Sequence, residues 1–184
     1  RDFGVLWIDA HGDFNTPETT PSGNIHGMSV AAMLGRGAFD EMEWARTDIR
    51  EENVAMVGLR DLDERERAAI ADSDIDAYTM GDIDRHGISS VVGNALDSAL
   101  EGVDGLHVSL DMDALDPGEA PGVGTPVHGG ITYREAHAAM ELIADRDACR
   151  SLEVVEVNPI LDSHNRTAEL GVELIASLLG KRIL

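Results

Sequence analysis

The chain has 184 residues, 43% of them hydrophobic, which is enough to bury a sizeable core, and we expect a single domain over residues 1–184. It is strongly acidic: 35 Asp and Glu residues against 14 Lys and Arg residues give a formal net charge of −21. This charge argues against nucleic acid or an anionic membrane surface as a partner. The acidity also suggests, as a hypothesis, a halophilic protein whose surface depends on screening by salt. Cys149 is the single cysteine, so an intrachain disulfide is excluded and we expect a reducing, cytoplasmic location.

The first half of the chain alternates between strand and helix patterns. Residues 5–8 are a continuous apolar run typical of a buried parallel strand, and a long polar loop follows over residues 14–25. A helix is expected through residues 28–34, whereas the charged residues 40–53 show no clear periodicity. Residues 54–58 predict a second strand. We then expect a helix through residues 68–71 and a short strand over residues 77–80.

The second half continues this alternation. Helical spacing predicts a helix over residues 89–100, a strand over residues 106–110 and a loop rich in Pro and Gly over residues 116–130. Thr132 and Glu135 form a capping box before a helix that runs through residue 144. A strand over residues 154–157 and a helix over residues 168–179 complete the pattern. It predicts an α/β fold of three layers (α/β/α), with a parallel sheet between two layers of helices.

Two clusters of polar side chains follow strands of the predicted sheet. Asp9, His11 and Asp13 come directly after the first strand, and alternation along extended backbone places them on one side. Asp111 and Asp113 repeat the pattern after the strand over residues 106–110. Because ligands of open α/β sheets bind beyond the carboxyl ends of the strands, the two clusters can converge. Five such ligands suit two divalent metal ions that share bridging carboxylates.

The order of short motifs along the chain resembles the arginase branch of the ureohydrolases. The matching motifs are Asp9-Ala-His11-Gly-Asp13, Ser22-Gly-Asn24-Ile-His26-Gly27, Gly58-Leu-Arg60-Asp61-Leu-Asp63, Ser109-Leu-Asp111-Met-Asp113, Gly124-Thr125-Pro126 and Glu156-Val-Asn158-Pro159. One short motif would be weak, but this many in family order form a very specific signal. The resemblance implies an arginase-like fold and hydrolysis of L-arginine to L-ornithine and urea, which would place the protein in arginine metabolism such as the urea cycle.

The resemblance also implies a pair of manganese ions as the cofactor. It makes Asp9 and Asp111 bridging ligands, assigns His11 and Asp113 to one ion, and assigns Asp13 to the other. Manganese suits a set of ligands that consists mostly of oxygen atoms. Two close metal ions can lower the pKa of a water that bridges them, so that hydroxide is available near neutral pH.

Three further residues receive catalytic or substrate-binding roles from the resemblance. His26 would relay protons, which suits an imidazole because the ordinary pKa of histidine lies near neutral pH. Glu156 would hold the planar guanidinium of the substrate through charge-assisted hydrogen bonds. The catalytic residues are then His26, Glu156 and the metal ligand Asp13. Thr125 would orient Glu156 or the guanidinium. We read the remaining histidines as structural or surface residues: His86, His107, His128, His137 and His164.

The amino-acid end of the substrate is matched by a second group of residues. In the resemblance Asn15 and Ser22 hold the α-carboxylate, while Asp61, Asp63 and Glu66 lie on the α-amino side. A substrate that lacks the carboxylate would leave such polar groups unpaired, which is costly. The long loop from Asn15 therefore favours arginase over agmatinase.

Members of the family carry a Gly-Gly-Asp-His segment upstream, and nothing in this chain matches it. The chain starts with Arg1 rather than Met and its first strand follows within a few residues, so we expect an N-terminally truncated part of a longer protein. On this reading some sheet strands are missing, the metal site of Asp13 lacks its upstream histidine ligand, and the isolated chain is impaired. The strand that carries Glu156 should then lie at one edge of the sheet.

Other functions remain open from the sequence. Within the same chemistry, the chain could belong to another ureohydrolase, such as an agmatinase or a guanidino-acid hydrolase. From a different class, it could be a non-catalytic, truncated metal-binding module. The resemblance further implies a homo-oligomer, a trimer or hexamer, for the full-length protein.

Overall fold

The computed structural model describes residues 3–42 and 47–182. Its middle layer is a parallel sheet of five strands in the order β3-β2-β1-β4-β5, which confirms the predicted α/β fold. The strands are β1 (Phe3–Ile8), β2 (Val54–Leu59), β3 (Asp76–Thr79), β4 (Gly105–Asp111) and β5 (Cys149–Val155). The first strand of the chain therefore occupies the centre of the sheet, between β2 and β4.

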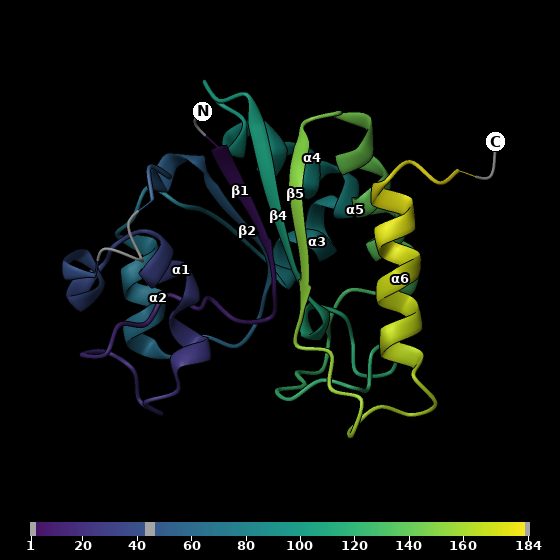
Figure 1. Ribbon diagram of the computed structural model, residues 1–184, viewed down its shortest axis with the longest axis horizontal. Coiled ribbons are helices and arrows are strands. Elements are labelled where there is room, and N and C mark those ends of the chain that lie inside the picture. Colours follow the sequence, from purple (N-terminus) through teal and green to yellow (C-terminus); the bar gives the residue numbers. More distant parts are fainter. Residues whose placement is uncertain (1–2, 43–46, 183–184) are drawn as a thin grey trace.

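Helices cover both faces of the sheet, so the molecule has the three layers that we expected (Figure 1). One layer holds α1 (Ser29–Met33) and α2 (Glu64–Ala71), and the other holds α3 (Met80–His86), α4 (Ile88–Ala99), α5 (Tyr133–Asp145) and α6 (Arg166–Leu178). Short 3-10 helices lie in the connections: η1 (Ile25–Met28), η2 (Gly37–Glu41), η4 (Glu51–Asn53) and η5 (Met112–Ala114). The Thr132–Glu135 capping box at the start of α5 is confirmed.

The strand β1 supplies side chains to two separate hydrophobic cores. Leu6 and Ile8 pack in the core on the side of α4 and α5, whereas Val5 and Trp7 pack in the core on the side of α1. Burial on both faces explains why this strand is an uninterrupted apolar run rather than an alternating one. A rigid central strand of this kind fixes the position of the loop that follows it.

Two elements differ from the prediction. Helix α3 was missed because it begins at Met80, directly after β3, so the short apolar run that we read as strand continues into a helix. The strand predicted over residues 154–157 begins earlier, at Cys149, and ends before Glu156. Because β5 lies at the sheet edge and is only partly buried, it contains the polar residues Arg150, Ser151 and Glu153. These interrupt the apolar run, so the sequence pattern predicted too short a strand. Residues 43–46 of the charged stretch lie outside the described residues.

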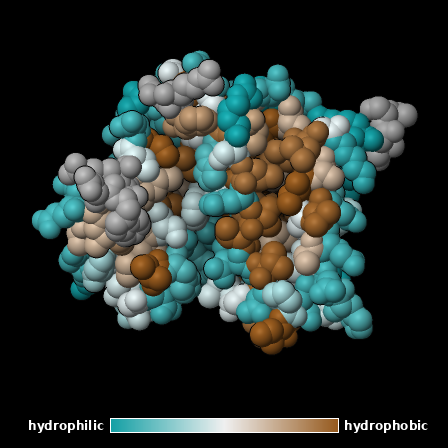
Figure 2. All heavy atoms as spheres, viewed as in Figure 1, coloured by the Kyte–Doolittle hydropathy of each residue, from teal (hydrophilic) through white to brown (hydrophobic). Residues whose placement is uncertain are grey.

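Strand β5 forms one edge of the sheet, as expected for the strand that leads to Glu156. Figure 2 shows apolar side chains gathered over β5 and between it and α6. Leu152 and Val154 of β5 are only partly buried against the core. In the part of the chain that the structure describes, no helix is long and apolar enough to cross a membrane.

Candidate active site

The two predicted polar clusters lie beside each other at the carboxyl ends of β1 and β4. These strands are neighbours, and Ile8 pairs with Leu110 in their register, so Asp9 and Asp111 follow at the same level. Beyond β4 the chain enters η5, which carries Asp113. The parallel pairing of two strands far apart in the sequence therefore brings the clusters together.

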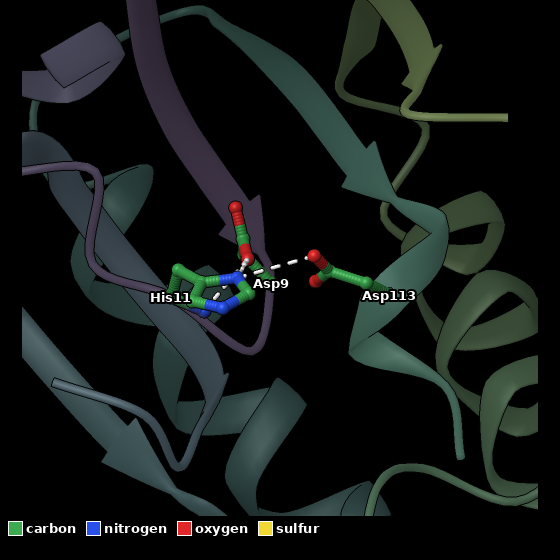
Figure 3. Close-up of side chains that lie close together, drawn as sticks. All are labelled: Asp9, His11 and Asp113. Carbon is green, nitrogen blue, oxygen red and sulfur yellow. Dashed lines mark hydrogen bonds and ion pairs between the residues drawn. The ribbon is translucent and has the colours of Figure 1, made fainter. Parts of the chain in front are cut away.

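Asp9, His11 and Asp113 form the tightest part of this group. Their potential ligand atoms all lie within 4.8 Å of one another. Nδ1 of His11 is 3.1 Å from Oδ2 of Asp113 and 3.4 Å from Oδ1 of Asp9. Figure 3 shows the carboxylate of Asp113 reaching from the β4 side toward the imidazole, while Asp9 and His11 come from the end of β1. An ion between them would have oxygen and nitrogen donors from both strands.

Hydrogen bonds hold these carboxylates in place. Nε1 of Trp7 donates to Oδ2 of Asp9 at 3.0 Å, and the backbone N–H of His11 donates to Oδ1 of Asp9 at 2.7 Å. The backbone N–H of Asp113 donates to Oδ1 of Asp111 at 2.7 Å. Partners of this kind orient metal ligands and restrict their rotamers.

Burial and mutual repulsion shift the pKa values of the residues in this cluster. Asp9, Asp111 and Asp113 are at most 6% exposed. Burial, followed by repulsion from Asp9, raises the pKa of Asp111 to about 9 and that of Asp13 to about 8. Burial alone would lower the pKa of His11, but its hydrogen bonds to Asp113 and Asp9 outweigh that effect and raise it to about 11. Without a cation, protons must neutralise this group of acids.

The donor set therefore fits a divalent metal. Buried carboxylates that would otherwise take up protons are compensated when a cation binds, and carboxylate oxygens with one imidazole nitrogen suit manganese or a similar ion. Asp9 and Asp111 follow the paired residues Ile8 and Leu110, so they are the first donors at the carboxyl ends of the two neighbouring strands. The bridging roles of Asp9 and Asp111 stay a prediction.

The predicted catalytic residues line one cavity with the cluster. This cavity, of about 390 Å³, is bordered by Asp13, His26, Thr125 and Glu156 as well as by the metal-binding candidates. Asp13 and Glu156 both have left-handed backbone, with φ of 49° and 62°. Such backbone is uncommon in residues other than glycine and tends to occur at functional sites. The sequence did not indicate this backbone conformation, which among the described non-glycine residues is shared by Asp147, His164 and Asn165.

A second cavity of about 250 Å³ adjoins the first, since His11, Asp13, His26 and Thr125 border both. Its lining includes all of the residues predicted to recognise the amino-acid end of the substrate: Asn15, Ser22, Asp61, Asp63 and Glu66. The structure thus places every predicted site residue along one continuous hollow, with the acidic cluster at one end and the polar loop at the other.

Three residues that border the second cavity already have hydrogen-bond partners in the protein: Asn15, Asp63 and Glu66. Nδ2 of Asn15 donates to Oδ2 of Asp63 at 2.7 Å, and Asp63 also caps α2 by accepting from the backbone of Arg65 and Glu66. Glu66 is 6% exposed and accepts a hydrogen bond from the backbone N–H of Phe14 at 2.9 Å. Glu66 therefore holds the loop as well as bordering the cavity, while Asp63 and Asn15 are already paired with each other.

One histidine at the site was not identified from the sequence. His107, which we read as structural or surface, borders the main cavity with its Nε2 3.6 Å from Oε1 of Glu153. Its position was visible in the alternation of β4, which places His107, Ser109 and Asp111 on one face. Among the other histidines, His137 packs against Tyr133. The rest are exposed: His86, His128 and His164.

Comparisons with known proteins find relatives that match nearly the whole chain. The model of the arginase family matches residues 1–180. The chain is 54% identical over 185 residues to an arginase of Bacillus subtilis, and the match covers all of this chain and 62% of that protein. A crystal structure of the Bacillus subtilis arginase superposes with a TM-score of 0.94 at 53% identity, covering all of this chain and 64% of that one.

A more distant structure extends the comparison to a complex with L-ornithine. An arginase of Entamoeba histolytica, solved with L-ornithine, superposes with a TM-score of 0.90 at 35% identity, covering 98% of this chain and 61% of that one. The chain thus spans a little under two thirds of the length of these relatives.

Proposed function

The chain belongs to the arginase family, and we propose that it forms most of the active site of a manganese-dependent enzyme that hydrolyses L-arginine to L-ornithine and urea. The observation that carries this proposal is the cluster of Asp9, His11 and Asp113, which opens into the cavity bordered by Asp13, His26 and Glu156. A buried group of acids beside a substrate-sized hollow suits metal-assisted hydrolysis of a cationic group.

We propose two metal positions. Asp9, His11, Asp111 and Asp113 would hold one manganese ion, while Asp13 would bind a second ion together with the bridging carboxylates of Asp9 and Asp111. In the family pattern an upstream histidine completes that second position, and nothing in this chain matches it. When bound, the metal pair would supply an activated water for attack on the guanidinium carbon.

The substrate would lie along the two adjoining cavities. Glu156, which borders the same cavity as the acidic cluster, would accept hydrogen bonds from the guanidinium and keep its central carbon facing the metal ligands. Thr125 already donates a hydrogen bond to Oδ2 of Asp113, so we assign it an orienting role in the metal ligand set. His26 is exposed at the border of both cavities, where it can exchange protons with solvent and with the departing amine.

The second cavity would select the amino-acid end of the substrate. Asn15 and Ser22 would contact the α-carboxylate, and Asp61, Asp63 and Glu66 would provide negative charge around the α-ammonium group. Agmatine has no α-carboxylate, so it would leave the polar groups of Asn15 and Ser22 without that partner. This difference predicts a preference for L-arginine.

Urea release from L-arginine and from agmatine, measured side by side with saturating manganese, tests the proposal. The assay uses this chain and, in parallel, the complete product of its gene with whatever sequence is encoded upstream of Arg1. Glu156→Gln should lose activity because it removes the charge that faces the guanidinium. Glu173→Gln, a change of the same kind on the exposed face of α6, serves as the matched control and should retain it.

Each result has a distinct meaning. Urea from L-arginine in preference to agmatine supports the proposal. A preference for agmatine, or for a guanidino acid, would assign the protein to another ureohydrolase activity. Manganese binding by the complete product without urea from any of these substrates would overturn the enzymatic assignment in favour of a metal-binding role.

A further inference from the structure

Arg60 lies directly after β2, and the end of that strand is irregular. Pairing between β2 and β3 shifts register between Val57 and Leu59, which makes Gly58 the extra residue of a bulge. Gly58 has φ of +101°, and an added Cβ would lie 3.1 Å from the carbonyl oxygen of Asp9. Bulges of this kind re-aim the side chains that follow them. The side chain of Arg60 is thereby directed toward the end of β4.

The backbone at Arg60 contacts the first metal-binding segment. Its N–H donates to the carbonyl of Ala10 at 2.9 Å, and the N–H of Asp61 donates to the same oxygen at 3.1 Å. Ala10 lies between the ligand candidates Asp9 and His11. The peptide that joins these two ligands is therefore fixed by the segment after β2.

The guanidinium of Arg60 contacts the second metal-binding segment. Nη2 donates to the backbone carbonyl of Asp113 at 2.6 Å and to that of Leu115 at 3.3 Å, and Nη1 donates to that of Ala114 at 3.1 Å. Nη2 and Nε also donate to the carbonyl of Val127, at 2.8 Å and 3.2 Å. Every one of these acceptors belongs to the backbone rather than to a metal ligand's side chain.

The contact to Val127 extends this network to Thr125, two residues earlier in the same loop. The hydroxyl of Thr125 donates to Oδ2 of Asp113, so Arg60 fixes both the backbone of Asp113 and the loop that orients its carboxylate. Gly130 leaves space for this arrangement, because an added Cβ there would lie 2.6 Å from Nη2 of Arg60. A planar fork with several fixed N–H donors can serve carbonyls on two segments at once, whereas a lysine ammonium cannot reproduce that geometry.

We propose that Arg60 is a positioning residue that holds the metal ligands after β1 and those after β4 at the spacing that manganese requires. Its backbone N–H holds Ala10, and its guanidinium holds the carbonyls of Asp113 and Val127, which are the contacts that a side-chain substitution removes. In this proposal Arg60 is neither a metal ligand nor a substrate-binding residue. The inference rests on the proposed function in one respect: it takes these carboxylates to be metal ligands.

The test compares Arg60→Met, Arg60→Lys and the control Arg85→Met. Arg85 is 69% exposed on α3 and pairs with Asp82 at the surface, so its replacement removes the same charge far from the metal ligands. For each purified protein, the manganese dissociation constant is measured by calorimetric titration, and the melting temperature is measured without metal. Titrations are run well below the lowest melting temperature, so that only folded protein is compared.

Arg60→Met should weaken manganese binding about 10–100-fold, the usual effect of removing a residue that supports metal ligands. Arg60→Lys, which keeps the charge but loses the fork, should recover only part of this loss, and Arg85→Met should bind like the original protein. If Arg60→Met does not fold, the comparison of Arg60→Lys with the original protein decides the question. Unchanged manganese affinity in a folded Arg60 variant, even with a lower melting temperature, would reduce Arg60 to a structural role and overturn the proposal.

Failure of this inference can be told apart from failure of the proposed function. If the original protein binds no manganese, the metal site itself is wrong. If it binds manganese but releases no urea, the proposed reaction is wrong, while the affinities still decide the role of Arg60. Where urea is released, Arg60→Lys should lower kcat at subsaturating manganese and leave KM for L-arginine unchanged.

Discussion

The hydroxyl of Thr125 donates a hydrogen bond to Oδ2 of Asp113 at 2.8 Å. It connects the Pro- and Gly-rich loop after η5 to the acidic cluster. Burial acts to raise the pKa of Asp113, but its contacts with His11, followed by this hydrogen bond from Thr125, lower the pKa overall. The loop therefore helps to keep this carboxylate ionised and oriented toward His11.

Replacing Thr125 by Val should weaken manganese binding, because Asp113 loses a hydrogen bond to its charged form, worth roughly 1.5–3 kcal/mol. Thr125→Ser keeps the hydroxyl and should bind manganese nearly as well as the original protein. Titration of both variants with manganese measures the difference. Equal affinities would show that the hydroxyl does not support the metal ligand.

The second prediction concerns bridging carboxylates. Asp111→Ala should abolish manganese binding more completely than Asp13→Ala, because Asp111 is proposed to contact both ions and Asp13 only one. The stoichiometry of bound manganese after desalting, determined by atomic absorption, gives the comparison. Equal retention of manganese in the two variants would contradict the bridging assignment.

Much of this site could be inferred from the sequence because its residues lie at short, regular spacings after apolar strands. In each cluster the side chains are two positions apart, as in extended backbone: Asp9 and His11 after β1, and Asp111 and Asp113 after β4. Parallel pairing of β1 and β4 then brings the two clusters together. The role of Arg60 could not be inferred in the same way. Apart from Gly58, the acceptors of its guanidinium are backbone carbonyls 53 to 67 positions away. Every residue has a backbone carbonyl, so the sequence does not show which ones accept.

The errors in the fold have a related cause. The length of β5 was underestimated because an edge strand with one partly exposed face lacks the apolar run of a central strand. Helix α3 was missed because β3 passes into it without a loop, so Met80 continued an apolar strand pattern while already in helical backbone. The left-handed backbone of Glu156 likewise depends on tertiary contacts.

The stability of the metal-free protein should fall as pH rises. The pKa values of Asp13 and Asp111 are raised from 3.8 to about 8 and about 9, so between about pH 4 and pH 9 the native state binds more protons than the unfolded chain. His11, raised from 6.5 to about 11, contributes with the same sign at higher pH. Stability from these groups is therefore present in weak acid and is lost toward alkaline pH.

Melting temperatures measured with a chelator across this pH range should decline, and saturating manganese should remove the decline by replacing the protons. Carboxyls whose pKa is lowered, such as Asp63 and Asp116, act in the opposite direction but only as pH falls through their own low pKa values. A melting temperature of the metal-free protein that rises steadily between about pH 5 and pH 9 would contradict the protonated cluster.

The last prediction concerns salt and follows from the net charge of −21. At ~0.01 M ionic strength the Debye length is ~30 Å, so exposed carboxylates repel one another across the whole molecule and oppose compaction. At ~1 M it falls to ~3 Å and most of this repulsion disappears. Salt also weakens surface ion pairs such as Arg50–Glu52 and Arg146–Asp97. Exposed pairs of this kind contribute only ~0–1 kcal/mol each, so the relief of repulsion should prevail.

We therefore expect the melting temperature to rise as potassium chloride increases from dilute to molar concentrations, with manganese kept saturating because screening also weakens its binding. A parallel series in sucrose separates charge screening from general exclusion of solutes. A flat or falling melting temperature in potassium chloride would show that the acidic composition serves solubility alone and that the protein does not depend on salt.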